Sequence, residues 1–285
     1  MTGRVCVLTG ASSGIGLATA RALRRMGATL ALVSRDRGRA AEAMAGLRAE
    51  SGEGDVTLFL ADLSSQAEIR RLAAALCERY PAIHVLVNNA GIVNLRRSTT
   101  VDGIEAVFAV NHLAYFLLTH LLLARLQASA PARIVNVASD AHRFGTIDLA
   151  DLGHARRYRP MRVYASSKLA NILFTYELAR RLASTGVTAN CLHPGAVATR
   201  LGYNNGRVAA AIAKLLRPFF RTPEQGAATA IYLASSPVVD GVSGKYFVDC
   251  REARASRATY DTELACRLWD ASARLTDLEA AAAGI

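Results

Sequence analysis

Val5-Cys6-Val7-Leu8-Thr9-Gly10-Ala11-Ser12-Ser13-Gly14-Ile15-Gly16 is the stretch that decides the fold of this 285-residue chain. The short apolar run predicts a strand, and the glycines after it predict a tight turn into a helix. Glycines at such a turn also let a pyrophosphate approach the backbone at a helix N-terminus. We therefore predict a nucleotide-binding loop with the spacing Gly-x-x-x-Gly-x-Gly. Its expected contact residues are Gly10, Ser12, Ser13, Gly14, Ile15 and Gly16.

Outward from this loop, apolar runs alternate with segments of helical period. We expect strands near residues 4–9, 29–34, 56–61, 83–87, 132–138, 187–192 and 245–249. We expect helices near 14–26, 37–51, 65–79, 102–127, 163–184 and 223–235, with a C-terminal helix at about 259–280. Such alternation with Val/Ile/Leu-rich strands is typical of a parallel sheet covered on both faces. No linker or repeat divides the chain, so we predict one doubly wound α/β domain over residues 1–285 with a seven-stranded parallel sheet.

The segment 198–222, between the sixth expected strand and the helix after Pro223, is irregular and carries several large apolar residues. Ligands bind at the carboxyl ends of strands in sheets of this kind, so we predict that this insertion is a substrate lid. Two alternatives stay open. The segment can be a surface helix packed on the core, or an amphipathic helix in weak contact with a lipid interface.

Composition limits the expected partners and location. The net charge is +11, but the arginines are scattered in short clusters, so we expect solvated helix faces and no nucleic acid. The cysteines are odd in number and the histidines show no ligand spacing, so we expect reduced thiols and no metal. The chain enters a strand directly. Its best membrane candidate, residues 113–126, is short and carries His120, so we expect a buried helix there. We therefore expect a cytoplasmic protein without a transmembrane segment.

The end of the second expected strand indicates which nucleotide binds. An acidic side chain there binds a ribose 2′-hydroxyl and repels a 2′-phosphate, whereas an arginine does the opposite. Ser34 occupies the expected acid position and Arg35 follows it, which favours NADP(H) over NAD(H). Asp36 is the alternative, because a shift of one residue in the strand register would reverse this preference.

Two further strand ends carry residues suited to the adenosine half of a dinucleotide. Asp62 and Leu63 end the third strand, where a carboxylate can lie beside the adenine amino group. The motif Asn88-Asn89-Ala90-Gly91 ends the fourth strand, and we predict that its last three residues form a shelf of small residues for the cofactor. Their arrival at successive strand ends favours this interpretation over ordinary turns.

Tyr164 and Lys168 are four residues apart on an expected helix, in a chain that contains only three lysines. Residues at this spacing share a helix face, so the ammonium can lie beneath the phenol. A neighbouring positive charge stabilises a phenolate, and we expect it to lower the pKa of Tyr164 toward the working range. A tyrosine and a lysine at this spacing are common by themselves, and the motifs elsewhere in the chain make a catalytic role the better interpretation.

Taken in order, the glycine loop, the motif at 88–91, Asn111, Ser139 and the Tyr164/Lys168 pair resemble the short-chain dehydrogenase/reductase family. The resemblance runs from Val5 to about Leu278. Its finer features, at 111–119, 167–171, 192–195, 242–247 and Trp269, are similar to the subgroup of retinol dehydrogenases and protochlorophyllide-reductase-like proteins. It implies a Rossmann fold, and helices 102–127 and 163–184 as the faces that family members often use to form homo-oligomers.

The resemblance also implies roles for individual residues. Tyr164 would exchange a proton with the substrate oxygen, Lys168 would lower its pKa and hydrogen-bond the nicotinamide ribose, and Ser139 would hold the same oxygen. Asn111, through a local helix distortion, would hold a water molecule that links Lys168 to solvent. Residues expected to face the nicotinamide are Pro194, Gly195, Val197 and Thr199.

The function that these residues imply is hydride transfer between NADP(H) and a small-molecule carbonyl or alcohol substrate. We expect a ketone or aldehyde reductase, or the same enzyme run as an alcohol dehydrogenase. Two alternatives remain on the same fold. One is a non-catalytic NADP-binding sensor or scaffold, although such proteins commonly lose the Tyr or the Lys. The other is a non-redox cyclase or epimerase that uses Tyr164 as an acid/base.

Overall fold

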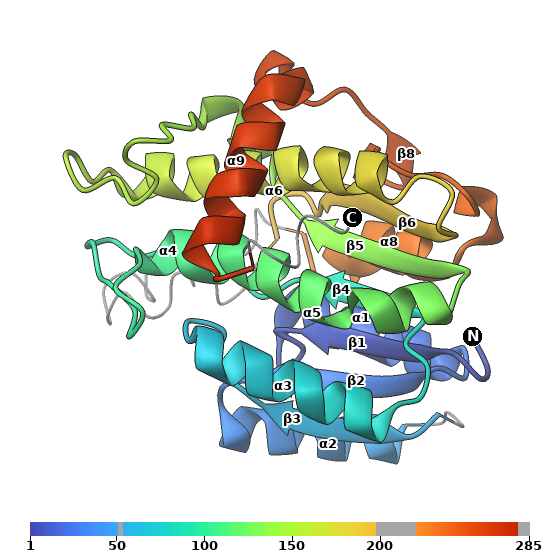
Figure 1. The fold of residues 1–285 in the computed structure, drawn as a ribbon. Helices are drawn as coiled ribbons and strands as arrows, with labels where there is room; N and C mark the ends of the chain where they lie inside the picture. The colour runs from blue at the N-terminus through green and yellow to red at the C-terminus, as the bar shows by residue number, and fades with distance from the viewer. Residues whose placement is uncertain (51–53, 198–220, 279–285) are drawn as a thin grey trace.

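The computed structural model describes residues 1–50, 54–197 and 221–278, and one eight-stranded sheet forms its centre (Figure 1). The strands are β1 (Val5–Thr9), β2 (Thr29–Ser34), β3 (Val56–Leu60), β4 (Val85–Asn88), β5 (Ala132–Val137), β6 (Val187–His193), β7 (Tyr246–Val248) and β8 (Arg251–Glu252). Their order in the sheet is β3-β2-β1-β4-β5-β6-β7-β8, and β1 to β7 pair in parallel. The doubly wound α/β fold predicted from the sequence is confirmed.

The prediction of seven strands is wrong by one, because β8 adds an antiparallel edge. Phe247 pairs with Glu252 across the β7–β8 hairpin. The turn between them consists of Asp249 and Cys250, with φ angles of 51° and 60°. A turn with positive φ angles is normally recognised in a sequence by glycine or asparagine, and this turn contains neither. The sequence pattern therefore carries little sign of the hairpin.

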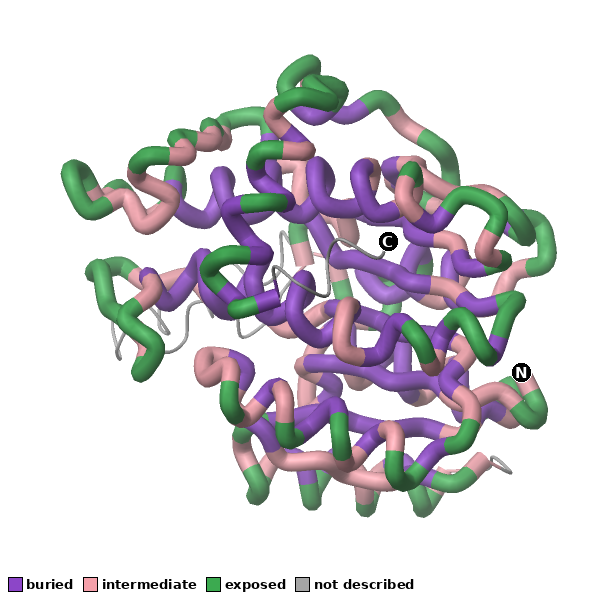
Figure 2. Tube along the Cα trace, in the orientation of Figure 1, coloured by how far each residue is buried: buried purple, intermediate pink, exposed green. Residues whose placement is uncertain are grey.

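Helices cover both faces of the sheet (Figure 1). One face carries α3 (Gln66–Arg79), α5 (Ala114–Ala128) and α6 (Pro160–Arg181), and the other carries α1 (Gly14–Arg25), α2 (Arg37–Ala49) and α8 (Pro223–Ser235). The central strands β1, β2, β4, β5 and β6 are mostly buried, as the purple of the central tube shows (Figure 2), whereas β3 is only partly buried. Burial on both faces explains why these strands are apolar at successive positions and do not alternate.

The C-terminal helix α9 (Thr262–Leu275) packs across α6 and also contacts α5 (Figure 1). Trp269 is buried between these helices, with its ring centroid 5.1 Å from that of Phe116 and 5.8 Å from that of Phe174. The predicted lid at 198–222 falls almost wholly on residues outside those described, and only Arg221 and Thr222 can be placed.

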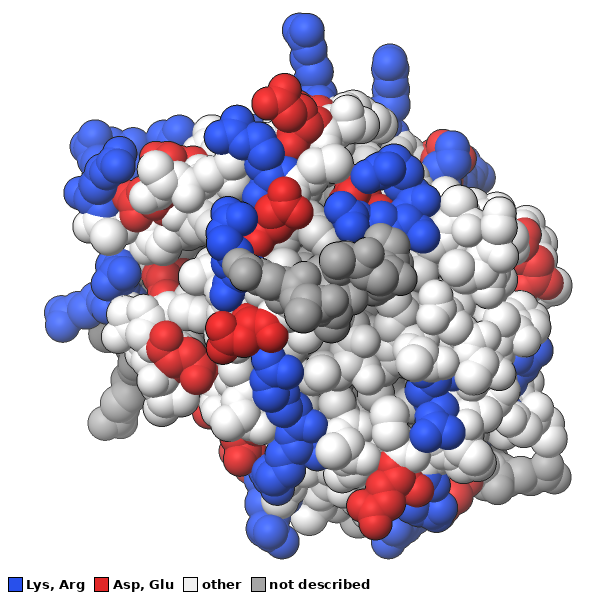
Figure 3. Space-filling view, viewed as in Figure 1, with Lys and Arg blue, Asp and Glu red and all other residues white. Residues whose placement is uncertain are grey.

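The helical segment Ala106–Ala128 is long and apolar enough to cross a membrane by length and composition. Most of it is buried within the protein, as the sequence predicts for this segment. It begins with the short helix α4 (Ala106–Phe108) and a π-helical turn, η1 (Ala109–Leu113), before it continues as α5. On the face drawn in Figure 3, lysine and arginine side chains form separate groups with acidic side chains among them.

The winding of the sheet reverses beside β1, because β1 lies between β2 and β4. In open α/β sheets the carboxyl ends of the strands on the two sides of such a switch point border the ligand site. The glycine loop follows β1 at this edge, and the ends of β4, β5 and β6 carry the other predicted site residues.

Candidate active site

The glycine loop after β1 is packed too closely for side chains. Gly10 has a φ of +66°, and a Cβ on it would lie 2.9 Å from the Cα of Ala90. A Cβ on Gly16 would lie 2.4 Å from the carbonyl oxygen of Gly10. Asn89 closes the same loop, because its Nδ2 donates to the carbonyl oxygens of Thr9 at 2.9 Å and Gly10 at 3.3 Å. Asn89 thus holds the loop against the end of β4.

In the described part of the chain, the N-terminus of α1 has no side-chain cap, as is also the case for α6. Within the described residues, Ser13 makes no side-chain capping bond there, and the first turn contains no acidic residue. Side-chain oxygens cap α2, α3, α8 and α9. Ser12 lies half-buried in the turn, and Ile15 is buried against α8. The uncapped N–H groups and the helix dipole suit an anion such as a pyrophosphate.

At the end of β2, the structure gives different surroundings to Arg35 and Asp36, the two charged residues between which the sequence did not decide. Asp36 caps α2, since its Oδ1 accepts the Arg39 N–H at 3.0 Å and its Oδ2 pairs with the Arg39 guanidinium at 2.7 Å. These bonds hold the pKa of the Asp36 carboxyl below its usual value. Ser34 is buried and its Oγ accepts the Asp36 N–H at 3.3 Å. Arg35 is exposed and forms no ion pair with a described acidic residue.

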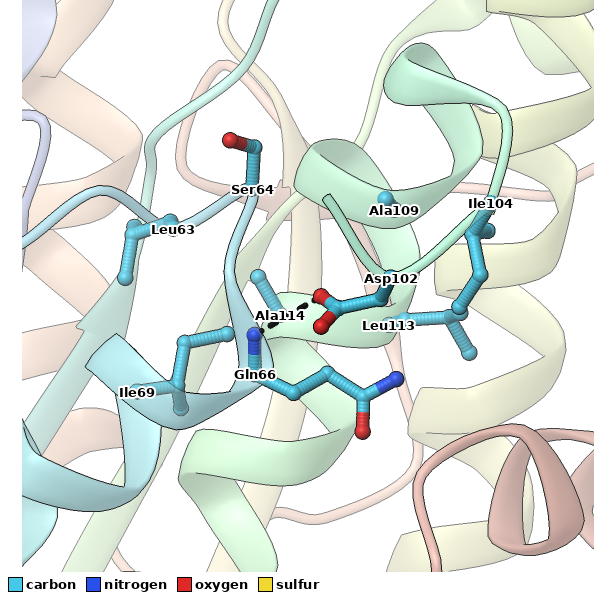
Figure 4. A pocket seen from close by; sticks show the side chains of 9 residues that line it. All are labelled: Leu63, Ser64, Gln66, Ile69, Asp102, Ile104, Ala109, Leu113 and Ala114. Atoms are coloured by element: carbon cyan, nitrogen blue, oxygen red, sulfur yellow. Dashed lines mark hydrogen bonds between the residues drawn. The ribbon is translucent and has the colours of Figure 1, made fainter. Parts of the chain in front are cut away.

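The end of β3 lies next to a small pocket. Asp62 accepts the Ser64 N–H at 3.0 Å in the turn, and Leu63 is buried. The pocket is lined by Leu63, Ser64, Gln66, Ile69, Asp102, Ile104, Ala109, Leu113 and Ala114 (Figure 4). Figure 4 shows the Asp102 carboxylate reaching across it to the Gln66 N–H, at 2.9 Å. None of the four predicted catalytic residues lines this pocket, so the pocket is not the centre of the catalytic group.

Asn111 lies in the middle of the π-helical turn η1 and is completely buried. Its Oδ1 accepts the Ile92 N–H at 2.8 Å, and its Nδ2 donates to the Ile92 carbonyl at 3.1 Å and to the Ser167 hydroxyl at 3.0 Å. A Cβ on Gly91 would lie 3.4 Å from Asn111 Oδ1 and 3.7 Å from Lys168 Nζ. The end of β4, the distorted helix and α6 therefore meet around Lys168.

Lys168 and Tyr164 are buried side by side on α6. The Lys168 ammonium donates to the Val137 carbonyl at 2.9 Å and lies 5.7 Å from the ring centroids of both Tyr164 and Tyr115. Tyr115 is absent from the predicted site, although it follows Asn111 by one helical turn. Its hydroxyl donates to the Ala90 carbonyl at 2.8 Å, which joins α5 to the end of β4.

Burial changes the pKa of both groups, and it contradicts one expectation. It raises the pKa of Tyr164 to about 12, whereas the sequence predicts a lowered value. It lowers the pKa of Lys168 to about 7. Both side chains are less than a tenth exposed, and a low-dielectric environment disfavours each charged form. Because Lys168 loses its proton well below the pKa of the phenol, it carries no charge that could offset the desolvation of Tyr164 when the phenol titrates.

Ser139 follows β5 and faces Tyr164. Its hydroxyl accepts the Ala141 N–H at 3.2 Å and so caps the 3-10 helix η2 (Asp140–Phe144). The Ser139 side chain near the Tyr164 phenol acts against the effect of burial on the pKa of Tyr164. Ser139, Tyr164, Lys168 and Asn111 are thus brought together from three separate parts of the chain.

The segment after β6 is held by its neighbours up to the last described residue. Gly195 has a φ of +82°, and a Cβ on it would lie 2.7 Å from the Cδ of Arg221. Val197 forms a parallel bridge with Arg221, whose guanidinium pairs with Asp249. Pro194, Gly195 and Val197 therefore lie at the same edge as the catalytic group, and Thr199 lies outside the described residues.

The described residues contain no group of three His, Cys, Asp or Glu side chains that could hold a metal ion. What the site offers instead is a glycine-lined helix N-terminus, an exposed arginine at the end of β2 and a buried phenol–hydroxyl–ammonium group. The first two suit an anionic dinucleotide, and the third can move a proton to or from an oxygen atom.

Comparisons with known proteins agree with this geometry. A family model described as short chain dehydrogenase matches residues 4–207. Human retinol dehydrogenase 14 is 45% identical, and the alignment covers 95% of this chain and 86% of that protein. None of the matches supports the cytoplasmic location expected from composition.

Two solved structures show the same fold. An uncharacterized protein from Mycobacterium paratuberculosis aligns with a TM-score of 0.78 and 35% identity, over 97% of this chain and 94% of that one. The Pseudomonas aeruginosa RhlG/NADP active-site complex aligns with a TM-score of 0.69 and 31% identity, over 87% and 94% of the two chains.

Proposed function

Since the chain belongs to the short-chain dehydrogenase family of oxidoreductases, we propose that it transfers hydride between NADP(H) and a carbonyl or alcohol substrate. The observation that carries this proposal is the burial of Tyr164 and Lys168 side by side on α6, near Ser139 and at the edge that also holds the glycine loop. We take residues 1–285 as one NADP-binding unit. The nicotinamide, when bound, supplies the hydride.

The protein's own residues supply the proton and orient the substrate oxygen. Tyr164 is a neutral phenol at neutral pH because burial raises its pKa to about 12, so it is ready to donate a proton to a carbonyl oxygen. Ser139 holds the same oxygen. Lys168 has a pKa near 7 and can pass a proton toward the phenol, with Asn111 and η1 beside it as the route to solvent.

The preference for NADP(H) rests on the end of β2. Arg35 is exposed and forms no ion pair with a described residue, whereas the Asp36 carboxylate is occupied as the cap of α2. The 2′-phosphate would therefore meet a cation and no competing carboxylate. The RhlG/NADP complex, which aligns over most of this chain, supports the same choice.

We propose an apolar aldehyde or alcohol of the retinoid type as the substrate. Its support is the name of the relatives, retinol dehydrogenases 12, 13 and 14, which are 41–45% identical to this chain in the mouse and human proteins.

A single assay separates this function from its alternatives. NADPH consumption is followed with retinal and with a panel of other aldehydes, ketones and quinones. Turnover with at least one of them supports the reductase. Tight NADPH binding without turnover on any substrate would favour a sensor, and conversion of a substrate without net NADPH consumption would favour a cyclase or epimerase.

A further inference from the structure

His142 lies behind Ser139 and joins it to a segment more than a hundred residues away. Its ring is completely buried on η2 and packs edge-on against Tyr246, with ring centroids 5.3 Å apart. Its Nδ1 lies 2.7 Å from the Ser139 carbonyl oxygen. Its Nε2 accepts the Ser256 N–H at 3.0 Å. Both ring nitrogens are therefore used.

These two partners fix the tautomer of the ring. A carbonyl oxygen can only accept, so Nδ1 must carry the proton, and a backbone N–H can only donate, so Nε2 must be unprotonated. Burial lowers the pKa of His142, which is consistent with a neutral imidazole. Because neither nitrogen is left over, His142 is poorly placed to exchange protons with a substrate.

Ser139 depends on this bond for the orientation of its peptide group. Its carbonyl accepts from His142 twice, from the ring and from the backbone N–H at 3.1 Å. Its hydroxyl accepts the Ala141 N–H at 3.2 Å. The two bonds to the carbonyl thus fix the peptide from which η2 starts, and η2 supplies the Ala141 N–H that holds the hydroxyl.

We propose that His142 is a positioning residue, which fixes the Ser139 hydroxyl toward Tyr164 by donating from Nδ1 while Nε2 anchors the ring to Ser256. The inference rests on the role of Ser139 in the proposed function. Of the two ring bonds, only the one from Nδ1 reaches Ser139, so that bond controls the rate. The bond to Ser256 serves to keep the ring in place.

Two amide variants separate the two bonds, since the Asn amide reaches the place of Nδ1 and the Gln amide reaches the place of Nε2. His142→Asn keeps a donor for Ser139 and should keep kcat close to the normal value. His142→Gln keeps an acceptor for Ser256 and loses the donor, and its kcat should fall by about 10- to 100-fold with the KM for NADPH unchanged. Equal losses in both variants, or a normal kcat in His142→Gln, would overturn the proposal.

Arg143→Ala is the matched control. Arg143 also ties η2 to the distant segment, through a bond from its guanidinium to the Arg254 carbonyl at 3.0 Å, but it does not contact Ser139. Its loss should leave kcat unchanged. A drop equal to that of His142→Gln would show that the attachment of η2 matters and the Nδ1 bond does not, which contradicts the proposal.

Nitrogen NMR of ¹⁵N-histidine-labelled protein gives a readout that needs no variant to fold. At neutral pH His142 should show a protonated Nδ1 and an unprotonated Nε2; the opposite tautomer or an imidazolium would refute the proposal. Ser139→Ala separates a failure of the positioning role of His142 from a failure of the proposed role of Ser139. If it lowers kcat while His142→Gln does not, only the positioning role fails; if it leaves kcat unchanged, the assigned role of Ser139 fails, and this inference with it.

Discussion

The proposed adenosine half of the carboxyl edge, around β1 to β3, and the proposed catalytic half, around β5 and α6, are built in different ways. The adenosine half depends on backbone geometry and exposed charge, with Gly10 at a φ of +66° and Arg35 open to solvent. The catalytic half depends on buried side chains, and Asn111, Tyr164 and Lys168 are all less than a tenth exposed. Substitutions in the first half should therefore change cofactor affinity, and substitutions in the second should change the rate or the pH dependence of stability.

Tyr164→Phe should have the largest effect. It removes the proton donor and preserves the ring, so kcat should fall by about 10²- to 10⁴-fold while NADPH binding is kept. Steady-state kinetics and fluorescence titration with NADPH measure the two quantities. A kcat near the normal value would show that Tyr164 does not donate the proton, and it would contradict the division between the two halves.

Lys168→Met should abolish a pH dependence of stability that the catalytic half imposes. The folded-state pKa of Lys168 is about 7, below the ordinary 10.5, so between these values the unfolded chain holds a proton that the folded protein lacks. The free energy of unfolding should therefore rise with pH across this window, by on the order of a few kcal/mol, and the variant should lack this rise. Urea unfolding at about pH 7 and about pH 9.5 tests it. An equal rise in both proteins would place the titration elsewhere.

Ser139→Ala should lower kcat by about 10²-fold, the usual cost of losing one hydrogen bond to a reacting oxygen. Affinity for NADPH should be unchanged, because Ser139 lies in the catalytic half. The measurement is again kcat against the dissociation constant of NADPH. A larger effect on NADPH binding than on kcat would contradict the division between the halves.

Arg35→Ala should have the smallest effect and should act on the other half. NADPH should bind about tenfold more weakly, a change of about 1.4 kcal/mol, and NADH should be almost unaffected. Since Arg35 is exposed, the difference should shrink as salt is raised. Arg37→Ala, at a nearby exposed arginine, is the control. Equal weakening of both nucleotides by Arg35→Ala would refute the contact with the 2′-phosphate.

The same division explains what could be predicted from the sequence. Glycine spacing and apolar runs are local signals, so the glycine loop and the positions of β1 to β7 could be predicted from the residues alone. Ser139 and Asn111 are ordinary residue types, and only their order along the chain, through a family resemblance, indicated a site.

What the sequence could not indicate depends on tertiary contacts. The pKa of Tyr164 follows from burial, which the spacing of Tyr164 and Lys168 does not reveal. That Asp36 caps α2 while Arg35 is exposed became clear only once the end of β2 was placed. His142 and Tyr115 touch their partners through bonds to backbone carbonyls, which no residue pattern specifies.

Hydride transfer itself is the most direct test of the proposed function. The protein is incubated with retinal and NADPH carrying deuterium at C4 of the nicotinamide, in separate samples labelled on either face. We predict that one of the two samples gives retinol with deuterium on the former carbonyl carbon, with one NADPH consumed for each alcohol formed. Retinol without deuterium from either sample would contradict direct hydride transfer at this site. If retinal is not reduced, the same measurement is made with the best substrate of the panel, and failure with every carbonyl compound would contradict the proposed function.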